Sequence, residues 1–343
     1  MTLLPTSLRL ILCLVSLVGA SACDKKTPPI VPTPLDPPTI SCGASVSLAV
    51  DVAPTIIQYA APVAAGGATP LATSCTIPSG GEFPVGTTDV ICSTTDAQQR
   101  RAQCVLQVTV SIAPRLIGTK ILAFGDSLTE GEVSLPARMP RAVETQSAYP
   151  TVLQTLLRER YLTQAADIVV YNDGKGGETV SQGEDRLVEQ IQALKPDALL
   201  LFQGTNDVNG GVLTADQIAT QIRAGISRAY RFGVKKVFVS TLLPQVPGRQ
   251  KAYAAPGVLD DVNDGIYYVA DREGAVVVDA WAAFNPQKEL LIGIDGLHPT
   301  ADGYKLLAEL FRDALKTHFE VAPAAAAPPA TTSGLFRRPS VRR

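Results

Sequence analysis

Five short, almost continuously apolar runs lie in the last two thirds of the chain and alternate with longer segments of helical period. Strands that are apolar on both faces are typical of a parallel sheet covered by helices on both sides. The predicted strands are Lys120–Phe124, Ile168–Asn172, Ala198–Gln203, Lys236–Leu242 and Ala275–Asp279, and the predicted helices are Pro150–Tyr161, Ser181–Leu194, Thr214–Phe232, Leu259–Glu273 and Thr300–Phe319. We therefore predict an α/β module with a five-stranded parallel sheet over residues 115–320.

Polar or glycine-rich segments follow these predicted strands, at the sheet edge where ligands bind in such folds. They are Gly125-Asp126-Ser127-Leu128, Asn172–Thr179 (NDGKGGET), Gly204-Thr205-Asn206-Asp207 and, before the last helix, Asp295–Pro299 (DGLHP). Each is a weak signal alone. Together, and in this order, they predict a single site.

The four segments resemble those of the GDSL, or SGNH, hydrolase family, and the resemblance covers the whole second module. It implies a flavodoxin-like three-layer α/β/α fold and hydrolysis of carboxylic esters through a serine. By this likeness Ser127 is the nucleophile, His298 the base and Asp295 its partner. The likeness also assigns Gly177 and Asn206 to the oxyanion hole.

The chemistry asks for these residue types independently. A serine hydroxyl needs a base to take its proton, and a histidine is suited to this task near neutral pH. Asp295, three residues before His298, allows one turn to place a carboxylate against the other ring nitrogen. The second histidine, His318, falls in the last turn of the last predicted helix, where we expect a solvated side chain.

Donors for a developing oxyanion are also available. The N–H of Ser127 begins a strand-to-helix turn, Gly177 lets the chain approach without a Cβ, and Asn206 adds an amide. Asp126 is expected to bond the backbone of the turn. Glu178 stands where the family commonly has Asp. This replacement does not affect Gly177, because the role of Gly177 is that of a main-chain donor.

Residues 39–113 show no helical period but several short alternating segments, which indicates a small all-β sandwich. We predict strands at Ser45–Val52, Thr55–Val63, Asp89–Ser93 and Ala102–Ile112, with Val46, Leu48, Val50 and Val52 on one half-buried face. Four of the six cysteines, Cys42, Cys75, Cys92 and Cys104, lie in this module and predict two disulfides. Three connectivities are open, of which we favour Cys75–Cys92 with Cys42–Cys104. The stretch from Cys75 to Cys104 resembles the hyalin-repeat (HYR) module, an immunoglobulin-like fold, which implies spacing, adhesion or contact with a cell surface or glycan.

The N-terminus predicts export. Residues 1–22 form a secretory signal peptide with an apolar run at Leu10–Val18, and Gly19–Cys23 resembles a bacterial lipobox in which Cys23 is lipidated. Ordinary cleavage with Cys23 left free is the alternative. The proline-rich residues 23–38 predict a spacer, and residues 321–343 a disordered tail. The expected location is a membrane-anchored lipoprotein, periplasmic or at the cell surface.

The charge balance argues against nucleic acid as a partner, because 30 Lys and Arg face 32 Asp and Glu, a formal net charge of −2. We expect no cofactor, and with two histidines in the whole chain no dedicated transition-metal site.

Two long loops, residues 131–147 and 243–257, are expected at the substrate edge. Their arginines, Arg138, Arg141 and Arg249, are more readily interpreted as solvated charge than as anion ligands. Trp281 and Phe284 fit an acyl or sugar pocket or the core equally well.

Three functional hypotheses follow. The first is an exported serine esterase that acts on short acyl groups, with acetyl groups on carbohydrate as a candidate substrate. The second is a lysophospholipase or lipase, although no long apolar lid is evident. The third is a non-catalytic surface adhesin, which gives no chemical reason for the serine, glycine, asparagine and histidine set.

Overall fold

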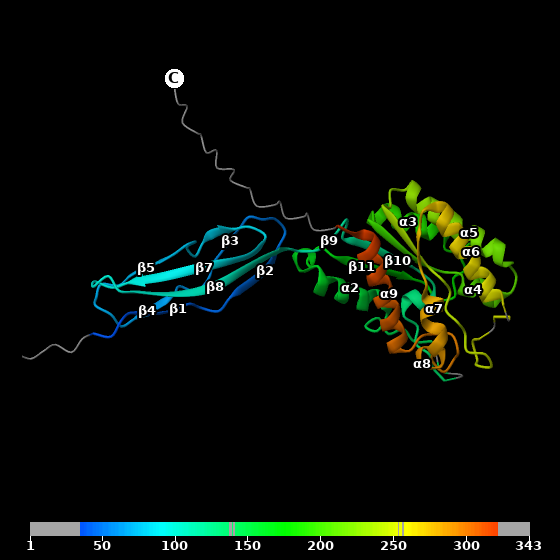
Figure 1. Ribbon diagram of the computed structural model, residues 1–343. Helices are drawn as coiled ribbons and strands as arrows, with labels where there is room; N and C mark the ends of the chain where they lie inside the picture. Colours follow the sequence, from blue (N-terminus) through cyan, green and yellow to red (C-terminus); the bar gives the residue numbers. More distant parts are fainter. Residues whose placement is uncertain (1–34, 137–138, 140, 253, 256, 322–343) are drawn as a thin grey trace, which may run out of the picture.

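The computed structural model describes residues 35–321, apart from residues 137–138, 140, 253 and 256 (Figure 1). The predicted signal peptide, Cys23, most of the spacer, nearly all of the C-terminal tail and Arg138 lie outside the described residues. Within the described part of the chain, no helix combines the length and the apolar character needed to cross a membrane.

The second module is built on the predicted parallel sheet. Its strands are β10 (Lys120–Gly125), β11 (Val169–Gly174), β12 (Ala198–Phe202), β13 (Lys236–Ser240) and β14 (Val276–Val278). They lie in the order β11-β10-β12-β13-β14, and every neighbouring pair is parallel. This is the flavodoxin-like order, in which the chain reverses its direction of winding beside β10. The predicted fold class is confirmed, and the strand ends differ from the prediction by at most two residues.

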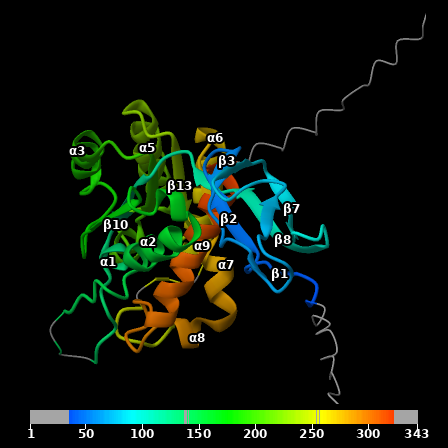
Figure 2. The ribbon, with the colours of Figure 1, turned by 90° about the vertical axis from the view of Figure 1, so that its left-hand side faces the viewer.

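Helices cover both faces of this sheet. On one face α2 (Tyr149–Arg160) packs beside α9 (Ala301–Phe319), as Figures 1 and 2 both show. On the other face lie α3 (Glu184–Leu194), α5 (Ala215–Arg231) and α6 (Val258–Glu273). The apolar stripe of each helix faces the sheet, which is why a continuous core of buried side chains fills both interfaces.

Several short elements were not predicted. They are α1 (Ser127–Glu130), α4 (Thr205–Gly210), α7 (Ala280–Phe284), α8 (Lys288–Leu291) and the short antiparallel pair β9 (Arg115–Leu116) and β15 (Glu320–Val321). Elements of two to six residues are too short to carry a periodic signal. Two of them, α1 and α4, begin directly at the predicted site segments.

The first module is a separate strand-rich unit. Its strands are β1 (Thr39–Ser41), β2 (Val46–Val50), β3 (Thr55–Ile57), β4 (Val63–Ala65), β5 (Ala72–Cys75), β6 (Gly81–Phe83), β7 (Gly86–Thr95) and β8 (Arg101–Ile112). A four-stranded sheet of order β2-β8-β7-β5 packs with two small strand pairs, β1-β4 and β3-β6. The disulfides are Cys42–Cys104 and Cys75–Cys92, the pairing that we favoured from the sequence.

Two details of this module were predicted wrongly. The expected strand Thr55–Val63 is two strands, β3 and β4, which pair with different partners. On the expected buried face of β2, Leu48 is 46% exposed, and Val52, beyond the end of the strand, is 73% exposed. Because β2 is the edge strand of its sheet, only part of that face is covered.

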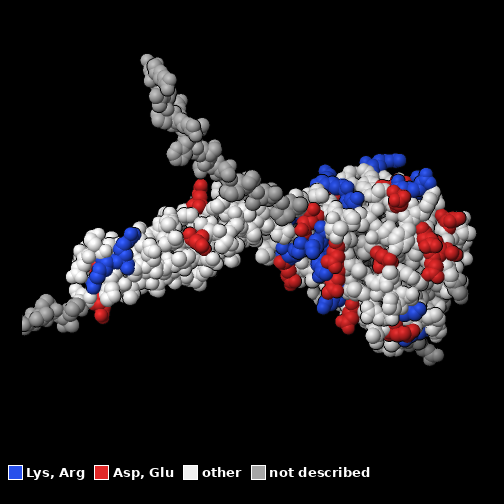
Figure 3. Space-filling view, viewed as in Figure 1, with Lys and Arg blue, Asp and Glu red and all other residues white. Residues whose placement is uncertain are grey.

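Charge is unevenly divided between the modules. In Figure 3, cationic and anionic side chains are interspersed over the second module, whereas the first module shows mostly uncharged surface. This mixture of signs is typical of a solvated surface rather than of a patch for a polyanion.

Candidate active site

Ser127 lies directly after β10, at the carboxyl edge of the sheet. The preceding residue, Asp126, accepts a hydrogen bond from the N–H of Leu128 at 3.0 Å and so caps α1. This cap turns the chain sharply from strand to helix. The predicted structural role of Asp126 is confirmed by this contact.

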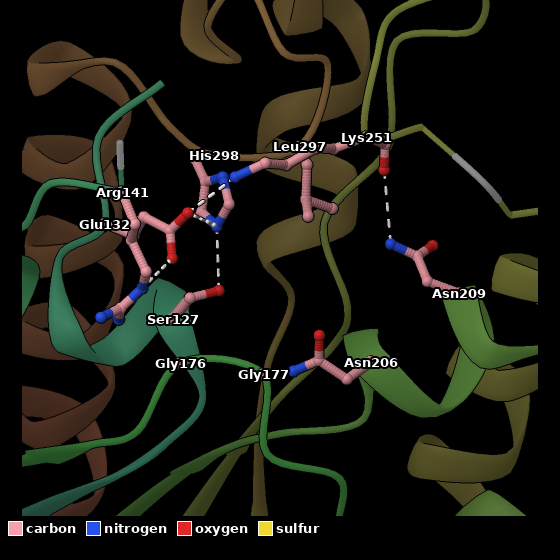
Figure 4. Close-up of a pocket in the computed structure, with 10 residues that line it drawn as sticks. All are labelled: Ser127, Glu132, Arg141, Gly176, Gly177, Asn206, Asn209, Lys251, Leu297 and His298. Atoms are coloured by element: carbon pink, nitrogen blue, oxygen red, sulfur yellow. Dashed lines mark hydrogen bonds and ion pairs between the residues drawn. The ribbon is translucent and has the colours of Figure 1, made fainter. Parts of the chain in front are cut away.

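His298 and Asp295 reach Ser127 from a segment far along the chain. The Ser127 Oγ lies 2.9 Å from Nε2 of His298, across 171 residues of sequence. The other ring nitrogen, Nδ1, lies 2.7 Å from Oδ2 of Asp295. All three residues are at most 6% exposed, so solvent does not compete strongly for these contacts. Figure 4 shows the contact between Ser127 and His298.

The carboxyl of Asp295 is held as an anion. Burial opposes its ionisation, but the hydrogen bond with the His298 side chain and those from the N–H groups of Leu297 and His298 lower its pKa well below the ordinary value. An ionised carboxylate at Nδ1 keeps the ring proton on that side. Nε2 is therefore free to accept a proton from Ser127.

Gly177 and Asn206 line the same pocket as Ser127. In Figure 4, Ser127 lies between His298 above and Gly177 and Asn206 below. Gly177 has φ +78°, a conformation that side chains disfavour, whereas a Cβ there would meet nothing within 4 Å. The glycine is therefore required by its backbone conformation and not, as we expected, by lack of space. The Asn206 Nδ2 donates to the carbonyl of Glu178 at 3.0 Å, which fixes the amide and leaves its second N–H free for a substrate.

Glu178 ties the loop that carries Gly177 to the core. Its carboxylate is 4% exposed and accepts hydrogen bonds from Arg186 and from Nε2 of Gln203. Arg186 in turn donates to the carbonyl of Gly125, at the end of β10. The loop is thus anchored to the core although Glu178 replaces the Asp that is common in the family.

The pocket itself has a volume of about 340 Å³, and most of the side chains that line it are polar or charged. Its lining residues are Ser127, Glu132, Arg141, Gly176, Gly177, Asn206, Asn209, Lys251, Leu297 and His298. The five predicted positions are brought together as the sequence suggested, although Asp295 lies behind His298 and not in the pocket wall.

Sequence reasoning did not single out Glu132 or Lys251, which also line this pocket. Glu132 accepts from Arg141 Nε at 2.6 Å and from Lys251 Nζ at 2.7 Å. Arg141 is exposed, as we expected of solvated charge, and it is also ion-paired and lines the pocket. Both long loops expected at the substrate edge do line the pocket, but no motif distinguished these residues within them.

The remaining candidates lie elsewhere. Arg249 donates to Glu289 and to the carbonyl of Gly293, and Phe284 is fully buried in the core. Trp281 is half-buried against the core and lines a different pocket. His318 is exposed at the end of α9, as predicted.

Within the described residues, no three or more His, Cys, Asp or Glu side chains gather in a way that could hold a metal ion.

Two buried carboxyls lie beneath the site. Burial raises the pKa of Asp126 to about 7, with the charges of Asp207 and Glu132 adding to the effect. One oxygen of Asp126 and one of Asp207 find no hydrogen-bond partner among the described residues. In the folded protein Asp126 is thus protonated up to about pH 7, whereas in the unfolded chain it ionises near pH 4, by the ordinary value of about 3.9.

The Asp126→Asn variant tests whether Asp126 is protonated in the folded protein. Between about pH 4 and 7 the folded state binds the extra proton, so the free energy of unfolding of the wild type falls as pH rises. Asparagine keeps an acceptor for the N–H of Leu128 and has no charge to lose. We expect the free energy of unfolding of the variant to exceed that of the wild type by about 1–4 kcal/mol at pH 8 and by almost nothing at pH 4.

Denaturant titrations at both pH values, followed by fluorescence of Trp281, the only tryptophan, measure this difference. An equal stability difference at both pH values would contradict it.

A serine, an imidazole and a carboxylate in line at the strand-end edge of a doubly wound sheet form the arrangement found in serine hydrolases. The model of the GDSL-like lipase/acylhydrolase family matches residues 123–306, and the chain belongs to this family. The HYR domain model matches residues 34–110, which confirms the predicted HYR module. The chain is accordingly a carboxylic ester hydrolase of the GDSL type.

The chain is similar to several individual proteins. An acetylxylan esterase of Geobacillus stearothermophilus is 25% identical over 207 residues, which are 57% of this chain and 92% of that protein. The structure of the aryl esterase of M. smegmatis matches with a TM-score of 0.50 and 20% identity, over 58% of this chain and 99% of that one. The carbohydrate acetylesterase Est24 of Sinorhizobium meliloti has a TM-score of 0.49 and 19% identity, with the same coverage. At 20% identity, the likeness to the aryl esterase is one of fold alone.

Proposed function

We propose that this protein removes short acyl groups, with acetyl groups on carbohydrate as the substrate class, by a Ser127–His298–Asp295 mechanism. The observation that carries the proposal is the unbroken line of contacts from Ser127 Oγ to Nε2 at 2.9 Å and from Nδ1 to Asp295 at 2.7 Å. In this proposal the oxyanion hole consists of the N–H groups of Ser127 and Gly177 and the side-chain amide of Asn206.

Acylation begins when Ser127 Oγ attacks the acyl carbon. As the new C–O bond forms, the serine proton passes to Nε2 of His298, and the carbonyl electron pair moves onto its oxygen, which the three donors stabilise. The intermediate collapses when the bond to the alcohol breaks, and the alcohol oxygen takes the proton from Nε2. Asp295 stabilises the imidazolium throughout.

Deacylation repeats these steps with water. Water attacks the acyl carbon and gives its proton to Nε2 of His298. The bond to Ser127 then breaks, and the serine oxygen regains the proton while the carboxylic acid leaves.

The polar and charged side chains that line the pocket support a hydrophilic substrate. Leu297 is its one aliphatic side chain, whereas Glu132, Arg141, Lys251 and Asn209 offer charges and amides. A long acyl chain gains its binding energy from contact with apolar side chains, and this pocket offers Leu297 for that contact. The acetylxylan esterase relative supports the same substrate class.

A substrate panel tests this proposal. p-Nitrophenyl acetate, butyrate and octanoate, acetylated xylan and a lysophospholipid are compared at equal enzyme, with the Ser127→Ala variant as the blank for each. We expect kcat/KM to fall steadily with acyl length and acetate to be released from xylan. A preference for octanoate or the lysophospholipid would favour a lipase, and wild-type rates equal to the blank would favour an adhesin.

We further propose that the protein is exported and anchored through Cys23. The two disulfides support export, because such bonds persist in oxidising compartments. Mass analysis of the mature N-terminus tests the anchor. A lipidated Cys23 is expected, and an unmodified N-terminus would contradict it.

A further inference from the structure

A second carboxylate lies beside the imidazole of His298. Oε1 of Glu132 is 3.7 Å from Nε2, the nitrogen that faces Ser127, whereas Asp295 lies against Nδ1 on the other side of the ring. In Figure 4, Glu132 and Lys251 both point toward the imidazole from the two long loops. The family-like segments of the sequence include neither residue.

The backbone holds Glu132 firmly in this position. Its N–H donates to the carbonyl of Ser127 at 3.0 Å, and its carbonyl accepts from the hydroxyl of Tyr304 at 2.6 Å. It also forms an isolated β-bridge with Val143. Its side chain is 7% exposed, so the carboxylate is fixed where a proton arrives during acylation.

Two cations balance this carboxylate in the resting enzyme. Lys251 Nζ lies 2.7 Å from Glu132 and 3.7 Å from Asp295, and it therefore bridges the two carboxylates that flank the ring. Arg141 binds the second oxygen of Glu132 at 2.6 Å. Burial opposes ionisation of Glu132, but the hydrogen bond from Lys251, the charge of an imidazolium at His298 and the hydrogen bond from Arg141 lower its pKa.

We propose that Glu132 is a positioning residue for the ester hydrolysis: it stabilises the His298 imidazolium from the Nε2 side, and Lys251 limits that stabilisation. The inference rests on the proposed Ser127–His298–Asp295 mechanism. An anion 3.7 Å away is attractive only once the ring is charged, so it acts on the transition state and hardly on the resting state.

The acid limb of the pH–rate profile is the direct readout, because it reports when His298 loses its proton. The charged groups that face the ring are Asp295, Glu132 and Lys251, with Arg141 behind Glu132. Removing the anion with Glu132→Gln should move the limb of kcat/KM to lower pH by about one unit and lower the plateau kcat about ten-fold. Removing the cation with Lys251→Met should move the limb in the opposite direction by a similar amount.

Two controls make the test specific. Glu132→Asp keeps the charge and should return the limb to within about 0.3 unit of the wild type. Glu289→Gln removes an exposed carboxylate that is ion-paired with Arg249, and it should leave both limb and plateau unchanged. Rates are normalised by active-site titration, so that a fraction of unfolded protein lowers the titre without moving the limb.

Opposite shifts in Glu132→Gln and Lys251→Met support the inference. Unmoved limbs, or limbs that move in the same direction, overturn it. The Ser127→Ala variant distinguishes failure of the proposed mechanism from failure of the inference about Glu132. If it keeps activity the proposed mechanism fails, whereas if it is inactive and the Glu132 limb is unmoved only the present inference fails.

Discussion

The Ser127→Ala and His298→Ala variants are each expected to lose about 10⁴–10⁶-fold in kcat, and the double variant is expected to lose no more than either. The reason is that the hydroxyl and the imidazole act as one unit joined by a 2.9 Å contact. Without Ser127 there is no nucleophile, and without His298 no base takes the serine proton. Residual activity would come from oxyanion stabilisation and binding alone.

Release of p-nitrophenol from the acetate ester measures this loss in purified, folded protein. The matched control is His318→Ala, since this exposed histidine at the end of α9 lies outside the site, and we expect its rate to equal that of the wild type. Losses that multiply in the double variant, or a loss below about 100-fold for His298→Ala, would contradict the assigned base.

Asn206→Ala is expected to lower kcat by about 10²–10³-fold with little change in KM. The amide of Asn206 is held by its hydrogen bond to the carbonyl of Glu178, so its remaining N–H is oriented before the substrate arrives. Such a donor is worth most where negative charge develops, which is in the tetrahedral intermediate and not in the bound ester.

The near-isosteric Asn206→Asp variant sharpens this prediction. It keeps the shape of the side chain but replaces the donor by an anion, and we expect a loss at least as large as in Asn206→Ala. Steady-state kinetics on the acetate ester at pH 8 separate kcat from KM. If both variants kept kcat within three-fold of the wild type, or lost only in KM, Asn206 would have no part in the oxyanion hole.

Much of the α/β module could be predicted because its signals are local. Each apolar run, such as Lys120–Phe124, became a strand within two residues of the expected bounds, since full burial needs uninterrupted apolar sequence. The first module was harder. Leu48 has the alternation of a buried strand, but its exposure depends on β2 being an edge strand, which only the three-dimensional pairing decides.

The site divides in the same way. Ser127, His298 and Asp295 stand at strand ends or in a recognisable spacing, so their convergence follows from the sheet order. Glu132 and Lys251 come from long loops, and charged loop residues are solvated in most proteins. The burial of Glu132 and the placement of Lys251 beside it depend on how two loops fold over one edge, which no periodicity encodes.

Ser127 and His298 are in contact although 171 residues separate them in the sequence. The active site can therefore form only in a chain that contains both segments. An incomplete or truncated chain that lacks the segment before α9 has the nucleophile but not its base. Such fragments should be inactive rather than partly active. Ester hydrolysis consequently reports whether the α/β module is folded. On heating, the activity and the folded fraction of this module should decrease together.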